Sequence, residues 1–249
     1  MSLENLRRIV GNASSSVCLA FMLGAPLSGC GSSLREADTV VRAGGSQPPS
    51  PALAAGQTRS GEGCHTDDPS HLCLALKYVV FDDSDGSPAI SEPTVSSDIS
   101  SINRIWDQCQ IHFQVDQFLS INPQKYDLAF HSAEDSDLDQ IRKTFMDSSS
   151  LLVVTTGKWN RSGSLGKTGA NAWTAMPGDI FYGVVLEAPV GDYPNIIAHE
   201  LGHYLNLDHV SNTANLMNPV IYEDSKRITQ SECQVALNAV KDYWKSMVR

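Results

Sequence analysis

The segment His199-Glu200-Leu201-Gly202-His203 constrains this chain more than any other part of its sequence. Residues four apart project from the same face of an α-helix, so a helix over this segment brings two imidazoles together. Glu200 lies one step around the same helix, where its carboxylate can reach a water molecule bound to a metal. Imidazoles at this spacing with a glutamate between them are typical of a zinc site that activates water. The segment therefore predicts a helix that carries metal ligands.

A third ligand is needed to complete a catalytic zinc site that leaves one position open for water. His209 follows His203 by six residues, beyond the end of the helix, so the chain has to turn back for its side chain to reach the metal. Asn206 lies between them, and asparagine adopts the left-handed conformation that such a turn needs more readily than most residues do. The sequence Asn215-Leu216-Met217-Asn218-Pro219 predicts a proline-ended turn around a methionine, Met217, eight residues after His209.

These two segments, HELGHYLNLDH and NLMNP, resemble the signature of the metzincin family of zinc metallopeptidases. The family pattern is H-E-x-x-H-x-x-G-x-x-H followed by a Met-turn, in which a methionine packs beneath the three imidazoles. Asn206 replaces the usual glycine, and Met217 matches the methionine of the turn. In the matrixin branch of the family a proline lies two residues after the methionine, and Pro219 resembles it in this position.

The resemblance implies a zinc-dependent endopeptidase that hydrolyses peptide bonds in extended protein or peptide substrates. It implies one catalytic Zn²⁺ held by three ligands, His199, His203 and His209. Glu200 would act as the general base, taking a proton from zinc-activated water and passing it to the leaving amine. The fold it implies is a metzincin-like zincin domain of the α+β or α/β class, with a mixed twisted sheet of four to five strands, an active-site helix and a C-terminal helix.

The resemblance also suggests where substrate binds, because metzincins bind it as an extended strand along the edge of the sheet above the helix. We expect residues 180–186 to form that edge strand, with Gly183 at a bulge or edge position. The segment 220–223 would wall the pocket for the side chain after the cleaved bond, and Tyr222 would serve as part of this wall or as an oxyanion contact.

Three alternatives remain open at this point. Glu223 lies 24 residues after His199, a spacing similar to the glutamate ligand of thermolysin-like gluzincins, and would replace His209 as the third ligand. The second alternative is a non-catalytic envelope lipoprotein with a structural zinc, although no cysteine near the motif offers a fourth ligand. The third is a Ca²⁺ loop at Asp83, Asp85, Gly86 and Glu92, but Phe81 at its first position favours a solvated loop.

The N-terminus indicates export. Arg7 and Arg8 precede the apolar run 17–27, which is too short to span a bilayer, and Leu27-Ser28-Gly29-Cys30 resembles a bacterial lipobox. We expect residues 1–29 to be a lipoprotein signal peptide, with Cys30 lipidated and serving as the membrane anchor. Residues 30–62 are rich in Ser, Gly, Ala and Pro and predict a flexible tether, leaving 63–249 as the catalytic domain. The predicted location is the bacterial cell envelope, lipid-anchored or secreted.

Net charge bears on the partners of the chain, and cysteine content bears on its compartment. The formal net charge is −10, so the chain lacks the basic surface that nucleic-acid binders need, and we expect a monomer without a nucleic-acid partner. After removal of Cys18 with the signal and lipidation of Cys30, four cysteines remain, an even number in an oxidising compartment. Proximity favours a disulfide between Cys64 and Cys73, and elimination leaves Cys109 with Cys233.

Hydrophobic periodicity predicts the order βαβαβ for the first half of the domain, which favours parallel neighbours in the sheet. The expected strands are 74–81, 111–116, 151–156 and 180–186, and the expected helices are 97–110, 138–146, 192–205 and one that begins after Thr229. Residues 157–178 are rich in glycine and are interpreted as a loop. His65, His71, His112 and His131 have no partners at ligand spacing and are expected to lie on the surface.

Overall fold

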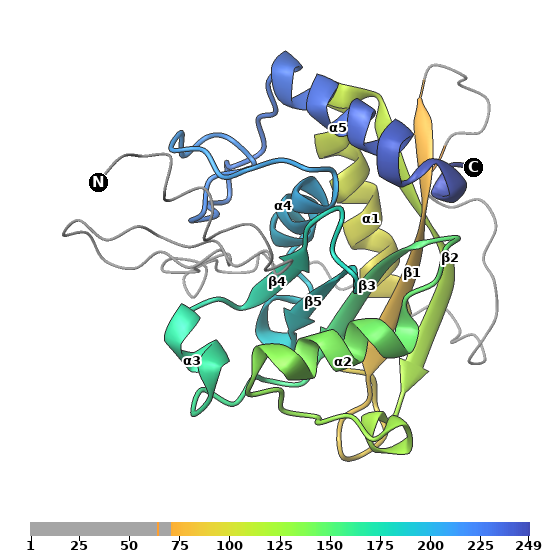
Figure 1. Ribbon diagram of the computed structural model, residues 1–249, viewed down its shortest axis with the longest axis vertical. Helices are drawn as coiled ribbons and strands as arrows, with labels where there is room; N and C mark the ends of the chain where they lie inside the picture. Colours follow the sequence, from red (N-terminus) through yellow and green to blue (C-terminus); the bar gives the residue numbers. More distant parts are fainter. Residues whose placement is uncertain (1–63, 65–70) are drawn as a thin grey trace, which may run out of the picture.

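A computed structural model describes Cys64 and residues 71–249 as one α/β layered domain (Figure 1). The predicted signal peptide, Cys30 and the tether lie outside these residues. A five-stranded sheet runs through the domain in the spatial order β2-β1-β3-β5-β4. Its strands are β1 (Leu72–Phe81), β2 (Ile111–Ile121), β3 (Leu151–Thr156), β4 (Ala172–Ala175) and β5 (Gly183–Glu187).

Helices cover both faces of the sheet. The α-helices are α1 (Glu92–Trp106), α2 (Asp135–Phe145), α3 (Ser164–Thr168), α4 (Pro194–Tyr204) and α5 (Gln230–Tyr243). Short 3₁₀ turns are η3 (Asp107–Cys109), η4 (Pro123–Tyr126), η5 (Ala188–Val190) and η6 (Lys245–Met247). Residues of α1, α4 and α5 share one hydrophobic core with the sheet, whereas α2 and α3 contribute to the other. The molecule is therefore a three-layer arrangement with α4 on the larger face.

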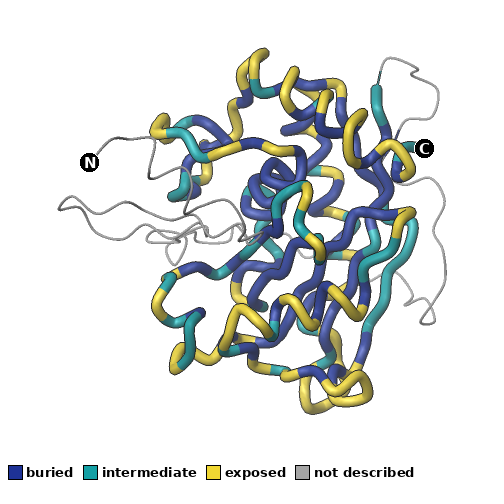
Figure 2. The backbone as a smooth tube through the Cα atoms, in the orientation of Figure 1, coloured by how far each residue is buried: buried dark blue, intermediate teal, exposed yellow. Residues whose placement is uncertain are grey.

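The central strands are buried on both sides, as the dark segments in the middle of Figure 2 show. Along β3, Leu151 and Val153 face the larger core, and Leu152 and Val154 face the smaller one. Parallel strands covered by helices on both faces carry continuous apolar runs instead of alternating patterns. For this reason the sequence predicted β3 with its observed bounds.

The predicted parallel order is confirmed for the first three expected strands, since β1 pairs with β2 and β3 in parallel, and β5 joins β3 in parallel as well. Two expectations are wrong. Residues 157–178 contain α3 and β4, and β4 pairs antiparallel with β5. Residues 180–186 therefore do not form the edge strand, because β5 lies between β3 and β4, and β4 occupies the edge.

A buried arginine fixes the β4–β5 edge to α2. Arg142 donates from Nε to the carbonyl oxygen of Gly183 at 3.0 Å and from a terminal nitrogen to the carbonyl oxygen of Trp173 at 2.9 Å. Asp139, one turn earlier on α2, accepts from the same guanidinium at 2.9 Å. Charged donors to buried carbonyls are among the stronger hydrogen bonds, so this contact sets the position of the edge hairpin.

Helix α1 begins earlier than its apolar spacing predicted. Ser91 caps the helix by accepting a hydrogen bond from the backbone nitrogen of Thr94, and Pro93 occupies the first turn, where proline is tolerated. At its other end Trp106 is fully buried and donates from Nε1 to the carbonyl oxygen of Ala198 on α4 at 3.2 Å. This contact holds α1 against the helix that carries the HELGH segment.

Both expected disulfides are present. Cys64 pairs with Cys73 across a sequence separation of 9, and Cys109 pairs with Cys233 across 124. The second bridge joins η3 to α5, whose predicted capping box, Thr229 with Glu232, is also found. No helix among the described residues is long and apolar enough to cross a membrane.

The two disulfides should differ in their contribution to stability, because loop-closure entropy grows with the length of chain enclosed. For separations of 124 and 9 residues, replacing Cys109 and Cys233 by alanine should lower the free energy of unfolding by about 5 kcal/mol, and replacing Cys64 and Cys73 by about 3 kcal/mol. Urea unfolding of both double variants measures the difference. Equal losses, or the reverse order, would contradict an entropic origin.

Candidate metal centre

The two helix histidines lie on α4, which Pro194 opens at its first position. The backbone nitrogen of Leu205 donates to the carbonyl oxygens of Leu201 and Gly202, both at 3.0 Å, and closes the helix. The sequence predicted a helix over 192–205, which agrees with the observed bounds within two residues. His199 and His203 are one turn apart on one face of this helix.

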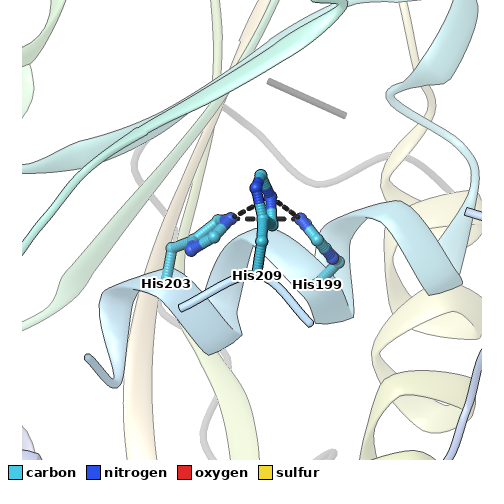
Figure 3. Close-up of side chains that lie close together, drawn as sticks. All are labelled: His199, His203 and His209. Atoms are coloured by element: carbon cyan, nitrogen blue, oxygen red, sulfur yellow. Dashed lines mark hydrogen bonds between the residues drawn. The ribbon is translucent and has the colours of Figure 1, made fainter. Parts of the chain in front are cut away.

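Three imidazoles converge above α4, as Figure 3 shows. The Nε2 atom of His203 lies 3.1 Å from that of His199 and 3.1 Å from that of His209, and the remaining pair is 3.3 Å apart. Three nitrogens bound tetrahedrally to zinc at about 2.0–2.1 Å would be separated by about 3.3–3.4 Å. The spacing of the three donor atoms thus fits one zinc ion.

Backbone carbonyls fix the orientation of the two helix imidazoles. Nδ1 of His199 donates to the carbonyl oxygen of Leu216 at 2.7 Å, and Nδ1 of His203 donates to that of Leu207 at 2.8 Å. A carbonyl oxygen only accepts, so Nδ1 carries the proton and Nε2 keeps its lone pair. Hydrogen bonding of this kind is the usual support of a metal-ligating histidine.

The surroundings also keep the imidazoles of His199 and His209 neutral, the form that binds metal. Burial, followed by the neighbouring imidazoles of His203 and His209, holds the pKa of His199 well below its ordinary value. Burial, with a smaller effect of His203, lowers the pKa of His209 to about 4. Two of the three ligands are therefore uncharged at neutral pH.

The chain returns His209 to the helix pair through a left-handed residue. Asn206 has φ of 65°, the conformation predicted for it from the sequence. The segment after His209 is then bonded to the Met-turn, because Val210 donates to the carbonyl oxygen of Met217 at 2.9 Å. Asn218 adds a second bond, from its side-chain nitrogen to the carbonyl oxygen of Val210 at 3.2 Å.

Met217 is fully buried and packs directly against the helix at Gly202. A Cβ atom at position 202 would lie 2.4 Å from the sulfur of Met217, closer than real contacts allow. Glycine at position 202 therefore lets the methionine side chain pack directly on the helix, and a larger residue would force that side chain to shift.

Glu200 is buried beside its neighbours and its carboxylate contacts the edge strand. The hydroxyl of Thr174 on β4 donates to Oε2 of Glu200 at 2.6 Å and lies 3.2 Å from the carbonyl oxygen of the same residue. No signal in the sequence pointed to Thr174, because it lies within the segment interpreted as a loop. Its position shows that β4, and not β5, borders the site.

Two other residues predicted at the site, Glu223 and Gly183, do not join the three imidazoles. Glu223 is exposed, and among the described residues the metal-binding group around the helix histidines contains His209 and not Glu223. Gly183 lies inside the sheet, where a Cβ would contact Leu152 and Arg142 on the α2 side, away from α4. Its expected place at an edge of the sheet is therefore wrong, and its role in substrate binding stays a prediction.

Tyr222 lies in the loop after the Met-turn, which is joined to the first turn of α4. The side-chain nitrogen of Asn195 donates to the carbonyl oxygens of Tyr222 and Glu223 at 3.2 and 2.9 Å. The segment 220–223 is thus anchored next to the start of the ligand-bearing helix.

Comparison with solved structures returns metalloproteinases. Metalloproteinase-II from Bacteroides fragilis has 14% sequence identity and a TM-score of 0.50, covering 70% of this chain and 55% of its own. The chain thus spans about half the length of that protein, and the likeness shows a shared fold. Archaemetzincin from Methanopyrus kandleri has 14% identity and a TM-score of 0.46, covering 71% of this chain and 99% of its own. No curated protein matches the sequence significantly.

A protein-family model matches most of the described domain. The model of the matrixin family of peptidases matches residues 75–237 of the 249-residue chain, a span that includes α4, His209 and the Met-turn. This match, over a span that holds the three converging imidazoles and Glu200, shows that the chain belongs to the matrixin family of zinc metallopeptidases.

Proposed function

We propose that this chain is a zinc-dependent endopeptidase that cleaves extended protein substrates, with Glu200 as general base. The observation that carries the proposal is the position of Glu200 on α4, between two metal-ligating histidines and bonded to the edge strand. A structural zinc site would be closed by a fourth protein ligand. Among the described residues, the group around His199 and His203 contains three ligands only.

His199, His203 and His209 would hold the ion through their Nε2 atoms. Zinc held there would supply a Lewis acid that polarises the scissile carbonyl and lowers the pKa of water toward 7. Glu200 would accept a proton from the water whose oxygen attacks the carbonyl carbon, and would deliver it to the amine nitrogen that leaves as the C–N bond breaks. Thr174 holds Oε2 of Glu200 by a hydrogen bond, so the carboxylate keeps one orientation while its other oxygen transfers the proton.

Strand β4 supports the assignment of an extended substrate. It ends the sheet order and pairs within the described residues with β5 alone, so its outer edge has backbone groups available to a further strand. A peptide added to this edge lies beside Thr174 and therefore beside Glu200. An open edge accepts the middle of a chain, which favours internal cleavage. The anchored segment 220–223, including Tyr222, would wall the adjoining pocket.

Replacing Glu200 by glutamine separates catalysis from metal binding. The variant should keep the zinc of the peptidase site, because all three imidazoles remain, and should lose activity on casein by about 10²–10⁴-fold, the range for a lost general base. Metal analysis and a casein-cleavage assay measure both. Asp242→Asn, on the exposed surface of α5, is the control and should leave both unchanged.

Two outcomes would contradict the proposal. If Glu200→Gln cleaves as well as the unaltered chain, Glu200 is not the base. If the unaltered chain holds zinc and cleaves no member of a broad peptide library, the non-catalytic envelope protein becomes the better account.

Replacing Thr174 by valine should lower kcat about 10–100-fold with little change in KM. The variant loses a hydroxyl donor to a carboxylate, a contact worth about 1.5–3 kcal/mol, while keeping the shape of the side chain. Thr174→Ser should restore most of the activity, because it restores the donor. Thr144→Val, on exposed α2 surface, is the control. An unchanged kcat in Thr174→Val would show that Thr174 does not position Glu200.

We further propose that the chain is exported and lipid-anchored at the bacterial cell envelope through Cys30. Two disulfides support an oxidising compartment, and the lipobox-like segment ends at Cys30. Labelled fatty acid should be incorporated into the wild-type chain and into Cys18→Ser, but not into Cys30→Ser. Equal labelling of Cys30→Ser and the wild type would refute the anchor.

A further inference from the structure

A second group of metal-ligating side chains lies at the opposite edge of the sheet from β4. It consists of His71, Asp107 and His112, whose ligand atoms all lie within 4.8 Å of one another. His112 is on β2, the strand that forms the far edge, and His71 immediately precedes β1. Both histidines were expected on the surface without partners at ligand spacing, and this expectation is wrong for His112, which is buried. The fold instead brings them to one carboxylate.

The two imidazole nitrogens meet at one carboxylate oxygen. Nε2 of His71 lies 3.1 Å from Oδ1 of Asp107, and Nε2 of His112 lies 3.2 Å from the same oxygen. The two rings are stacked, with centroids 4.5 Å apart and an interplanar angle of 28°. Both imidazoles therefore direct the same nitrogen, Nε2, toward Asp107. The separations are like those between the three nitrogens of the peptidase site, at 3.1–3.3 Å.

The backbone holds the three residues in place independently of any ion. Gln110 adopts a left-handed conformation, φ 56°, and turns the chain from η3 into β2, which sets Asp107 beside His112. The backbone nitrogen of Leu72 donates to the carbonyl oxygen of Gln110 at 2.8 Å, which brings His71 to the same corner.

A disulfide adds a covalent constraint to this corner. Cys73 lies opposite His112 in the β1–β2 register and is bonded to Cys64. Cys109, within η3, is bonded to α5 through Cys233. Ligands fixed in this way lose little conformational entropy on binding, which favours a preformed site.

We propose that His71, Asp107 and His112 form a second site, separate from the peptidase site, for a divalent transition-metal cation, with zinc as its first candidate. Two imidazoles and one carboxylate are ligands that zinc and its imidazole-binding neighbours prefer over calcium or magnesium. The histidine side chains are shielded, 18% and 10% exposed, while that of Asp107 is 62% exposed. Water can therefore complete the coordination from the solvent side.

The cation would join three segments that are distant in sequence. It would connect the residue before β1, the start of β2 and the turn after α1. Each of the two disulfides has one cysteine at this corner. Because the substrate edge, β4, lies at the other end of the sheet, occupancy of this site should affect stability and not peptide cleavage.

Zinc stoichiometry tests the proposal directly. The exported chain is stripped with a chelator, equilibrated with buffered free Zn²⁺ and analysed for bound metal. We expect two ions in the unaltered chain, and one in each of the single variants His71→Ala, Asp107→Asn and His199→Ala. His71→Ala combined with His199→Ala should bind none. His131→Ala, an exposed histidine on the loop before α2, is the matched control and should keep two.

A stability measurement guards against loss of metal through misfolding. In the His199→Ala chain, added zinc should raise the thermal midpoint, and the further change Asp107→Asn should abolish that rise without changing the midpoint in chelator by more than a few degrees. Casein cleavage by His71→Ala should match that of the unaltered chain.

The outcomes separate this site from the peptidase site. If His71→Ala and Asp107→Asn bind as much zinc as the unaltered chain, and zinc does not stabilise His199→Ala, the cluster is an ion-paired group only and the proposal is overturned. If His71→Ala loses one ion while His199→Ala loses none, the second site stands and the assignment of the peptidase site fails.

Discussion

The convergence of three imidazoles on one point is the constraint on which the rest of the structure depends. Each helix imidazole is held by a carbonyl oxygen from a segment that follows the helix, Leu207 for His203 and Leu216 for His199. The turn at Asn206 and the Met-turn are therefore parts of the metal site as much as the helix is. Gly202 allows the methionine to approach, since any side chain there would meet its sulfur.

The sheet edge completes the site from the other side. Thr174 joins β4 to Glu200, and Arg142 joins the same hairpin to α2 through the carbonyls of Trp173 and Gly183. The proposed base, the proposed substrate strand and the opposite helical layer are thus linked by hydrogen bonds. This arrangement gives a short four-residue strand a fixed position relative to the ligands, which a mobile loop would not supply.

Local signals in the sequence were sufficient for elements that are locally determined. The motif spacing predicted α4 and its ligands, the capping box at Thr229 and Glu232 predicted the start of α5, and an unbroken apolar run predicted β3. Asn206 was interpreted correctly because a left-handed turn restricts the choice of residue type. In each case the physical cause lies within a few residues of the feature.

Features that depend on distant pairing were not predictable. Ala172–Ala175 is too short to show periodicity, and only its pairing with β5 makes it a strand, so Thr174 and the true edge were missed. Gly183 suggested an edge position, yet its place inside the sheet is set by β3 and β4. His71, Asp107 and His112 lie on three separate segments, and no spacing along the chain relates them.

The most direct test of the central claim is an anomalous difference map at the zinc edge from crystals of the zinc-loaded chain. We expect a peak about 2.0–2.1 Å from the Nε2 atoms of His199, His203 and His209, with Glu200 adjacent but not a ligand. A peak bound by Glu223 in place of His209, or no peak between the helix histidines, would contradict it.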